Sequence, residues 1–452
     1  MMMSTTMGSG FPHWVAAACA IACVPHAAPL GAQEVGTEPT VFMHVSVLTM
    51  ESDSALHDRA VVVEDGRITW IGPSDDVEFP DGARRIEAAG RWLMPGLADM
   101  HVHMDASDIP LFLANGVTTV REMNGSDRHV ALRDSIERGL RPGPRMLIAS
   151  SLLAGEEQPW RHELIEDAQA AYAIAHAARE AGYDYLKVYD GLSRPAYLAL
   201  AEASETLGLP LTGHVPQSVG LEGVLEAGQA SIEHTEQIMY ATVGHRPDPS
   251  RIPEIAARIA ATGTWVTPTL AAQRMLSLNR TPAYNERLER PEVRYVDPGL
   301  RGWWASLAAP ADAAEPDPDD PRRRRAEAFY GFQRDLALAL HEAGVPLLVG
   351  TDTPNPLLVP GYSIHLELQA LTEAGIPAIE VLRAATVGAP QFAGSDADRG
   401  VVRVGADADL LLLNADPRER LETLEAPVGV MVGGSWFDQE ALEKVLAESG
   451  GG

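Results

Sequence analysis

The feature that most constrains the fold of this chain is the alternation of strand-like and helix-like segments between about residues 95 and 390. Short apolar runs such as "VTTVREM" and "LLVGTDT" alternate with alanine-rich helical segments such as "EDAQAAYAIAHAAREAG". Strands that alternate with helices form parallel βα units. The span contains eight strand candidates, and a (β/α)8 barrel typically needs about 250 residues. The sequence therefore predicts an α/β protein with a TIM-like (β/α)8 barrel over residues 95–397.

The two ends of the chain follow a different pattern. Residues 35–94 and 398–440 contain short runs of β-branched residues broken by turn residues, as in "VFMHVSVLTM" and "VGVMVGGSWF". Asp65 and Gly66, which separate two such runs, are a hairpin signal. Two β-rich ends around one barrel predict a second, smaller and discontinuous β-domain to which both ends of the chain contribute.

Residues 1–32 have the character of a secretory signal peptide, although the first of them carry no Lys or Arg. The run "HWVAAACAIACVPHAAPLGAQE" is apolar, too short to span a bilayer, and contains small residues at Gly31 and Ala32. We therefore expect a secreted or periplasmic protein; a lipoprotein anchor at Cys23 fits the preceding residues less well. Both cysteines, Cys19 and Cys23, lie in this segment, so the mature protein is expected to have no disulfide or thiolate site.

The net charge of -28 limits the classes of partner. Nucleic acids and anionic membranes need a basic surface, so neither is expected to bind this chain. A well-solvated surface explains the acidity better than a cationic substrate does. No stretch after residue 32 is apolar and long enough for a transmembrane helix. A homo-oligomer is compatible with this composition.

Residue types that commonly bind metals recur at the predicted carboxyl ends of the strands. His101 and His103 end the first strand candidate, and side chains two apart in a strand point to the same face. Taken alone, this pair is explained almost as well by two polar residues at a strand end. Four further residues lie near the ends of the fourth, fifth, sixth and eighth strand candidates: Lys187, His214, His234 and Asp352. A barrel gathers its active site at this end, so the set predicts a transition-metal site.

Lys187 is one of only two lysines in a chain whose other basic residues are arginines, and Lys444 lies in a polar tail. A protonated ammonium group cannot bind a metal and is costly inside a barrel. A deprotonated amine can take up CO2 to form a carbamate, an anionic ligand whose two oxygens can bridge two metals, whereas arginine stays protonated. The alternative role is an ion pair at a strand end, which arginine would serve equally well.

The motifs "MPGLADMHVHMD", "LKVY", "GHVP", "IEHT" and "VGTDTP" together resemble the amidohydrolase superfamily, and "AATVGAPQFAG" and "VGADADLLLL" are similar to its C-terminal signatures. The resemblance covers residues from about 41 to 440 and is strongest to the imidazolonepropionase-like and Xaa-Pro dipeptidase-like branch. It implies a distorted barrel with a β-sandwich built from both termini. It also implies two divalent metals, most often zinc. The implied ligands are His101, His103 and Asp352 for one metal, His214 and His234 for the other, and carboxylated Lys187 as the bridge.

This ligand set indicates a mechanism. Two divalent ions lower the pKa of a bridging water toward neutrality. The metal-bridging hydroxide would attack the scissile carbonyl, and Asp352 would carry the proton to the leaving nitrogen. We therefore expect a metal-dependent hydrolase that cleaves amide-type C–N bonds of a small-molecule substrate, such as a dipeptide or an N-acyl amino acid. The alternatives are hydrolysis of a lactone or a cyclic imide or amide, or deamination of a ring, at the same binuclear centre. A non-catalytic scaffold is disfavoured because no ligand is missing.

Two further residues are candidates for substrate binding. Tyr189 lies two residues after Lys187 and can share its face, either as a hydrogen-bond donor to the oxyanion or a substrate carboxylate, or as a packed strand-end residue. His365, in "PGYSIHLELQAL", follows the eighth strand and is expected to support the site or contact substrate, with a structural role at the helix start as the alternative. Arg121, which ends the second strand candidate, is expected to form a surface ion pair rather than bind a substrate carboxylate.

Two stretches depart from the pattern of dipeptide-cleaving relatives. The loop after the third strand reads "LLAGEEQPW" and lacks the Gly-Gly-His stretch that those relatives usually carry. Glu156 and Glu157 in this loop are expected to be solvated rather than to meet a basic substrate. "YDGLS" stands where many relatives have a Ser-Gly-Gly turn after the bridging lysine.

Overall fold

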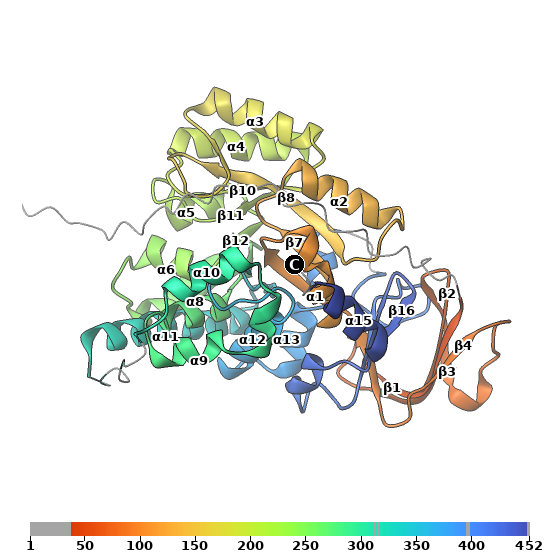
Figure 1. Cartoon of the computed structure of the whole chain (residues 1–452). Helices are drawn as coiled ribbons and strands as arrows, with labels where there is room; N and C mark the ends of the chain where they lie inside the picture. The colour runs from red at the N-terminus through yellow and green to blue at the C-terminus, as the bar shows by residue number, and fades with distance from the viewer. Residues whose placement is uncertain (1–37, 311–312, 314–316, 318, 395–397, 450–452) are drawn as a thin grey trace, which may run out of the picture.

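The computed structural model describes residues 38–310, 313, 317, 319–394 and 398–449 (Figure 1). The predicted signal peptide lies outside these residues. No helix among the described residues combines the length and the apolar character that crossing a membrane requires.

Seven parallel strands form most of a barrel, in the order of their sequence. They are β6 (Leu97–Val102), β7 (Val117–Glu122), β8 (Arg145–Ala154), β10 (Tyr185–Val188), β11 (Leu211–Gly213), β12 (Ser231–Glu233) and β13 (Trp265–Thr267). Residues 347–353 close the ring: Leu347 bridges Val266 of β13, and Thr353 bridges Val102 of β6, both in parallel. The predicted (β/α)8 barrel is confirmed, with an eighth strand that is irregular. A short strand, β9 (His162–Leu164), pairs with the end of β8.

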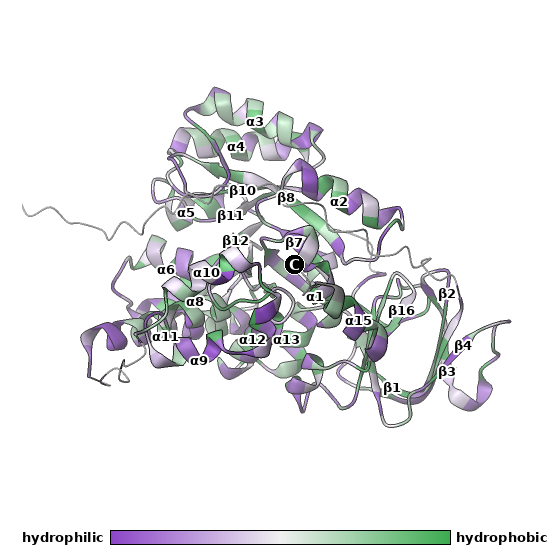
Figure 2. Ribbon diagram, in the orientation of Figure 1, coloured by the Kyte–Doolittle hydropathy of each residue, from purple (hydrophilic) through white to green (hydrophobic). Residues whose placement is uncertain are grey.

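Helices cover the outside of the barrel (Figure 1). They include α1 (Ile109–Ala114), α2 (Asp127–Glu137), α3 (Ala168–Glu180), α4 (Arg194–Leu207), α5 (Gly220–Glu226), α6 (Thr235–Thr242), α7 (Ile252–Ala260), α8 (Leu270–Ser277), α11 (Pro321–Glu342), α12 (Ser363–Glu373), α13 (Ala378–Ala384) and α14 (Gly388–Phe392). Side-chain caps start several of them: Ala170 N donates to Asp167 at the start of α3, and Ala196 N donates to Ser193 at the start of α4. Figure 2 shows hydrophobic colours along β8 and hydrophilic colours over α2, as expected for a covered sheet.

The long connection between β13 and the closing segment contains additional helices. These are α9 (Pro282–Leu288), the 3-10 helix η4 (Pro291–Tyr295) and α10 (Pro298–Ser306). Trp304 of α10 is buried in a cluster with Val359, which lies in the loop after the closing segment. Trp303 of the same helix meets Trp160 from the loop after β8, with ring centroids 6.3 Å apart. The long helix α11 follows this insertion, and its first arginines are exposed.

Both ends of the described chain build a second sheet, as predicted. Its strands are β1 (Thr40–Val47), β2 (Leu56–Glu64), β3 (Arg67–Pro73), β4 (Arg84–Glu87), β5 (Trp92–Pro95), β14 (Leu410–Leu413), β15 (Gly429–Val432) and β16 (Ser435–Asp438). The order β16-β15-β14-β5-β1-β2-β3 joins the late strands to the early ones where β14 pairs with β5. Asp65 and Gly66 both have positive φ in the tight turn between β2 and β3, as a type I′ hairpin requires. Trp436 of β16 packs edge-on against Phe42 of β1, with ring centroids 5.2 Å apart. Three strands lie between β16 and β1 in the sheet, so this contact shows that the sheet is curved.

Candidate metal centre

The six predicted ligand residues lie at the carboxyl ends of the barrel strands. His101 is in β6 and Lys187 is in β10, while His214 and His234 directly follow β11 and β12. His103 is one residue beyond β6, and Asp352 belongs to the segment that closes the barrel. Parallel strands end at a common edge, so residues far apart in sequence meet there.

His101, His103 and Asp352 form one compact group, in which one ligand atom from each lies within 4.8 Å of the others. Asp352 Oδ1 is 3.2 Å from His103 Nε2 and 3.4 Å from His101 Nε2. Asn355 Nδ2 donates to Asp352 Oδ2 at 2.7 Å, which fixes the carboxylate. Burial opposes ionisation of Asp352, but the neighbouring imidazoles of His234, His103 and His101 outweigh it and hold the pKa of Asp352 below its usual range. The group is therefore an ionised carboxylate between two imidazoles.

His214 and His234 continue the cluster on the other side of His101. The ring centroids of His214 and His234 are 5.2 Å apart, and those of His234 and His101 are 4.6 Å apart. Burial lowers the pKa of His234 to about 3 and places that of His101 well below its usual value. Both are neutral imidazoles near pH 7, which is the form that binds metals.

Lys187 lies among these groups with its side chain in the barrel interior. The residue is 1% exposed, and its Nζ has no hydrogen-bond partner among the described residues. Burial lowers the pKa of Lys187 to about 8, and the charge of Lys187 in turn lowers the pKa of both His101 and His234. A buried amine without a partner among the described residues, near the imidazoles of His101 and His234 and the carboxylate of Asp352, fits an amine that is modified and coordinated better than one that is protonated and free.

Three of the histidines are oriented by oxygens outside the cluster. His101 Nδ1 is 3.0 Å from Glu233 Oε2, His214 Nδ1 is 2.9 Å from Asp190 Oδ1, and His234 Nδ1 is 2.7 Å from Thr269 Oγ1. Such contacts fix the ring and its tautomer and leave Nε2 as the free ligand atom. The sequence reasoning missed these orienting residues; their only local signal is that Glu233 directly precedes His234 and Asp190 follows Lys187 by three residues.

The expectation that Arg121 forms a surface ion pair is wrong, because Arg121 does not lie at the surface. It is completely buried in the barrel interior, where Nη2 donates to Glu233 Oε1 at 2.8 Å and Nε donates to Met100 O at 2.6 Å. The Phe392 ring lies under its guanidinium at 4.9 Å. The inward-facing register of β7 explains this location. Arg121 and Glu233 thus form a buried ion pair directly behind His101.

The two candidate substrate residues have different surroundings. The ring of Tyr189 packs against His214 with centroids 4.2 Å apart, so Tyr189 borders the cluster. His365 instead lies between α12 and α1, where its Nε2 is 3.2 Å from Asn115 Oδ1. Two positions further along α12, the buried Glu367 accepts hydrogen bonds from Leu270 N and Ala271 N at the start of α8. His365 Nδ1 is buried and has no partner among the described residues.

The loop after β8 agrees with the expectation of solvated glutamates. Glu156 and Glu157 are both exposed; Glu156 lies against Gly191, and Glu157 Oε2 is 3.4 Å from His162 Nε2. Gly191 has a positive φ, and any side chain there would meet Glu156 at 2.6 Å. The glycine of "YDGLS" therefore permits the close approach of the two loops.

A barrel whose strand ends carry clustered imidazoles and a carboxylate is the scaffold of a hydrolytic site. Residues 92–437 match the amidohydrolase family. The chain belongs to this family and is a hydrolase, which confirms the resemblance drawn from the motifs.

Similar proteins include both curated sequences and solved structures. The imidazolonepropionase of Cupriavidus necator is 27% identical over 390 residues, which cover 80% of this chain and 86% of that protein. The structure of a bottromycin amidohydrolase superposes with a TM-score of 0.73 at 28% identity and covers 91% of this chain and 90% of its own. A putative prolidase from Bifidobacterium longum gives a TM-score of 0.68 at 26% identity, covering 91% and 99%.

Proposed function

We propose that this protein is a binuclear metal-dependent amidohydrolase that cleaves amide-type C–N bonds of a small molecule. The observation that carries the proposal is the Nζ of Lys187, which is buried without a partner in the part of the chain that the structure describes and acts electrostatically on histidines of both ligand groups. A lone metal bound by His101, His103 and Asp352 would leave this amine without a role. If Lys187 carried a carbamate, its role would be that of a ligand shared by two metals.

The residues fit two divalent ions, with zinc as the expected metal. His101, His103 and Asp352 would hold the first, His214 and His234 the second, and carboxylated Lys187 both. When bound, such ions supply Lewis acidity that polarises the scissile carbonyl and lowers the pKa of water. The neutral state of His101 and His234 suits this role, because neither must lose a proton to bind a cation.

Asp352 is the proposed general acid and base. It is ionised, and Asn355 holds its Oδ2 while its Oδ1 faces the imidazoles. As a base, it takes the proton of the attacking water, and as an acid it returns that proton to the leaving nitrogen. The tetrahedral intermediate then collapses with cleavage of the C–N bond. Tyr189, which packs against His214, is the proposed donor to the substrate oxygen.

The proposed substrate is a dipeptide or an N-acyl amino acid, which the structural likeness to a putative prolidase and a bottromycin amidohydrolase supports. The imidazolonepropionase relatives, whose name refers to a ring, support a second candidate: opening of a cyclic amide or imide or a lactone, or ring deamination, by the same site. We further propose that residues 1–32 direct secretion or transport to the periplasm.

The test is metal analysis combined with a carbon label. Wild-type protein grown with zinc and exposed to 13CO2 should contain two metals and a 13C carbamate signal. Lys187→Arg is the matched variant, because it keeps the positive charge but cannot be carboxylated; it should lose the signal and bind at most one metal tightly. Screening linear and cyclic amides with product masses then separates the two substrate classes. Two tightly bound metals in Lys187→Arg, or a zinc-loaded wild type that hydrolyses none of these compounds, would contradict the proposal.

A further inference from the structure

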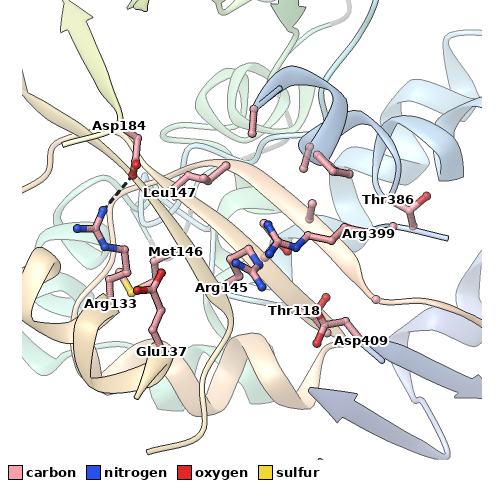
Figure 3. Close-up of a pocket in the computed structure, with 17 residues that line it drawn as sticks. Thr118, Arg133, Glu137, Arg145, Met146, Leu147, Asp184, Thr386, Arg399 and Asp409 are labelled. Carbon is pink, nitrogen blue, oxygen red and sulfur yellow. Dashed lines mark hydrogen bonds and ion pairs between the residues drawn. The ribbon is translucent and has the colours of Figure 1, made fainter. Parts of the chain in front are cut away.

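A cavity lies at the opposite end of the barrel strands from the metal cluster (Figure 3). Its volume is about 340 Å³, within the usual range for small-molecule sites. The amino ends of β6, β7 and β8 form one side, and α2, α14 and the chain leading to β14 form the others. No residue of the proposed metal centre lines it.

Three guanidinium groups and three carboxylates line the cavity, but Arg145 is not paired in good hydrogen-bond geometry. Asp407 lies beside three of them: its oxygens are 2.8 Å from Arg399 Nε, 3.1 Å from Arg67 Nη2 and 3.6 Å from Arg145 Nη2. The contact with Arg145 is too long for a hydrogen bond. Arg145 Nε is also buried and has no partner among the described residues. Arg145 is therefore a half-buried cation whose Nε donor is unused among the described residues.

Figure 3 shows Arg145 and Arg399 side by side at the centre of the cavity, with Asp409 and Thr118 on one side. Burial and then the charge of Arg399 lower the pKa of Arg145, while the carboxylates of Asp409, Asp407 and Glu137 oppose this shift. Asp409 does not form a hydrogen bond with them; it accepts one from Gly433 N at 2.7 Å, and burial raises its pKa. The two guanidinium groups thus form a paired, forked donor surface.

The other walls of the cavity limit the ligand. Arg133 is already paired with Asp184 at 3.2 Å, and Glu137 lines the cavity near them, so this side is not cationic. Leu147, together with alanine and proline side chains of α14, supplies apolar surface. These walls favour a ligand with a single negative charge and an apolar body over a compact dianion such as phosphate.

We propose that this cavity binds a small organic carboxylate, whose two oxygens accept hydrogen bonds from Arg145 and Arg399 while its apolar body contacts Leu147 and α14. Arginine suits this geometry because its planar fork matches a carboxylate. The site is distinct from the catalytic centre and does not depend on the function proposed for that centre.

The probe is 4-fluorobenzoate, observed by 19F NMR titration of the full chain. A carboxylate can also bind at a metal centre, so the titration is repeated on His101→Ala, which disables that centre. Binding in the cavity should survive His101→Ala and weaken about tenfold to a hundredfold in Arg145→Met. Arg141→Met is the matched control, because Arg141 is also half-buried, its Nε has no partner within the described ranges, and it does not line the cavity. It should bind like wild type.

A second variant keeps the test decisive if Arg145→Met folds poorly. Ala393→Phe places a ring into the cavity from the half-buried end of α14 and leaves the arginines in place, and it should also abolish binding. The amide-hydrolysis or metal-binding behaviour of both variants should match wild type. The proposal is overturned if 4-fluorobenzoate fails to bind at millimolar concentration, if binding is lost in His101→Ala, or if both cavity variants bind as wild type does.

Discussion

The buried ion pair behind His101 allows a quantitative prediction for Arg121→Met. The substitution keeps most of the side-chain volume but removes the hydrogen bonds to Met100 O, Ser231 Oγ, Thr267 Oγ1 and Glu233 Oε1. Glu233 then stays fully buried with its charge opposed only by weaker partners. Breaking such a pair costs about 3–5 kcal/mol of the free energy of unfolding, because an uncompensated charge remains inside the protein.

Urea unfolding of the metal-free protein, followed by circular dichroism, measures this loss directly. Arg133→Met is the comparison, because Arg133 pairs with Asp184 in a partly exposed site and should cost about 1 kcal/mol or less. The double variant Arg121→Met/Glu233→Gln removes the stranded charge as well. It should recover part of the loss, with a coupling energy of about 1–3 kcal/mol.

Metal affinity supplies an independent result, because Glu233 orients His101. Glu233→Gln should weaken metal binding about tenfold to a hundredfold. The reasoning is refuted if Arg121→Met unfolds within 1 kcal/mol of wild type, or if the double variant is less stable than the two single losses together predict.

Three further predictions concern residues around the centre. Asp190→Asn should weaken metal binding about tenfold to a hundredfold, measured by competition with a chelator, because Asp190 orients His214; unchanged affinity would exclude this role. Asp352→Asn should lower kcat by about 10²–10⁴ in the metal-loaded enzyme, and a normal kcat would remove Asp352 as the proton carrier. Burial raises the pKa of Glu367 to about 8, so the folded protein holds a proton that the unfolded chain releases near pH 4.5. The stabilisation from this group is therefore complete at low pH and is lost as the pH rises through 8; urea titrations should show that Glu367→Gln lacks this decline, whereas an identical slope would show that Glu367 is ionised.

The sequence was most informative where chemistry and strand periodicity coincide. His101, His103 and Asp352 could be grouped because parallel strands end at one edge, and the structure places their ligand atoms together. The alternation of strands and helices predicted the barrel, and the β-rich runs at the two ends predicted the composite sheet.

Contacts between distant side chains could not be predicted in the same way. Arg121 meets Glu233 only because both strands turn these positions inward at the same height in the barrel, and a single sequence carries no record of that register. Glu367 reaches the start of α8 through the packing of α12, which depends on the whole insertion after β13. The contact of His365 with Asn115 at the end of α1 likewise joins helices that lie far apart in the sequence.

The pairing of β14 with β5 determines when the protein can complete its fold. Met94 and Leu411 are partners in this sheet, although more than 300 residues separate them. While the chain is being made, the edge of β5 stays unpaired until the entire barrel has been synthesised, and exposed edges of this kind recruit other chains. Late, long-range closure of this kind is slow. The late strands β14, β15 and β16 thus complete the sheet. A nascent chain is vulnerable to aggregation until β14 has been synthesised and can pair with β5.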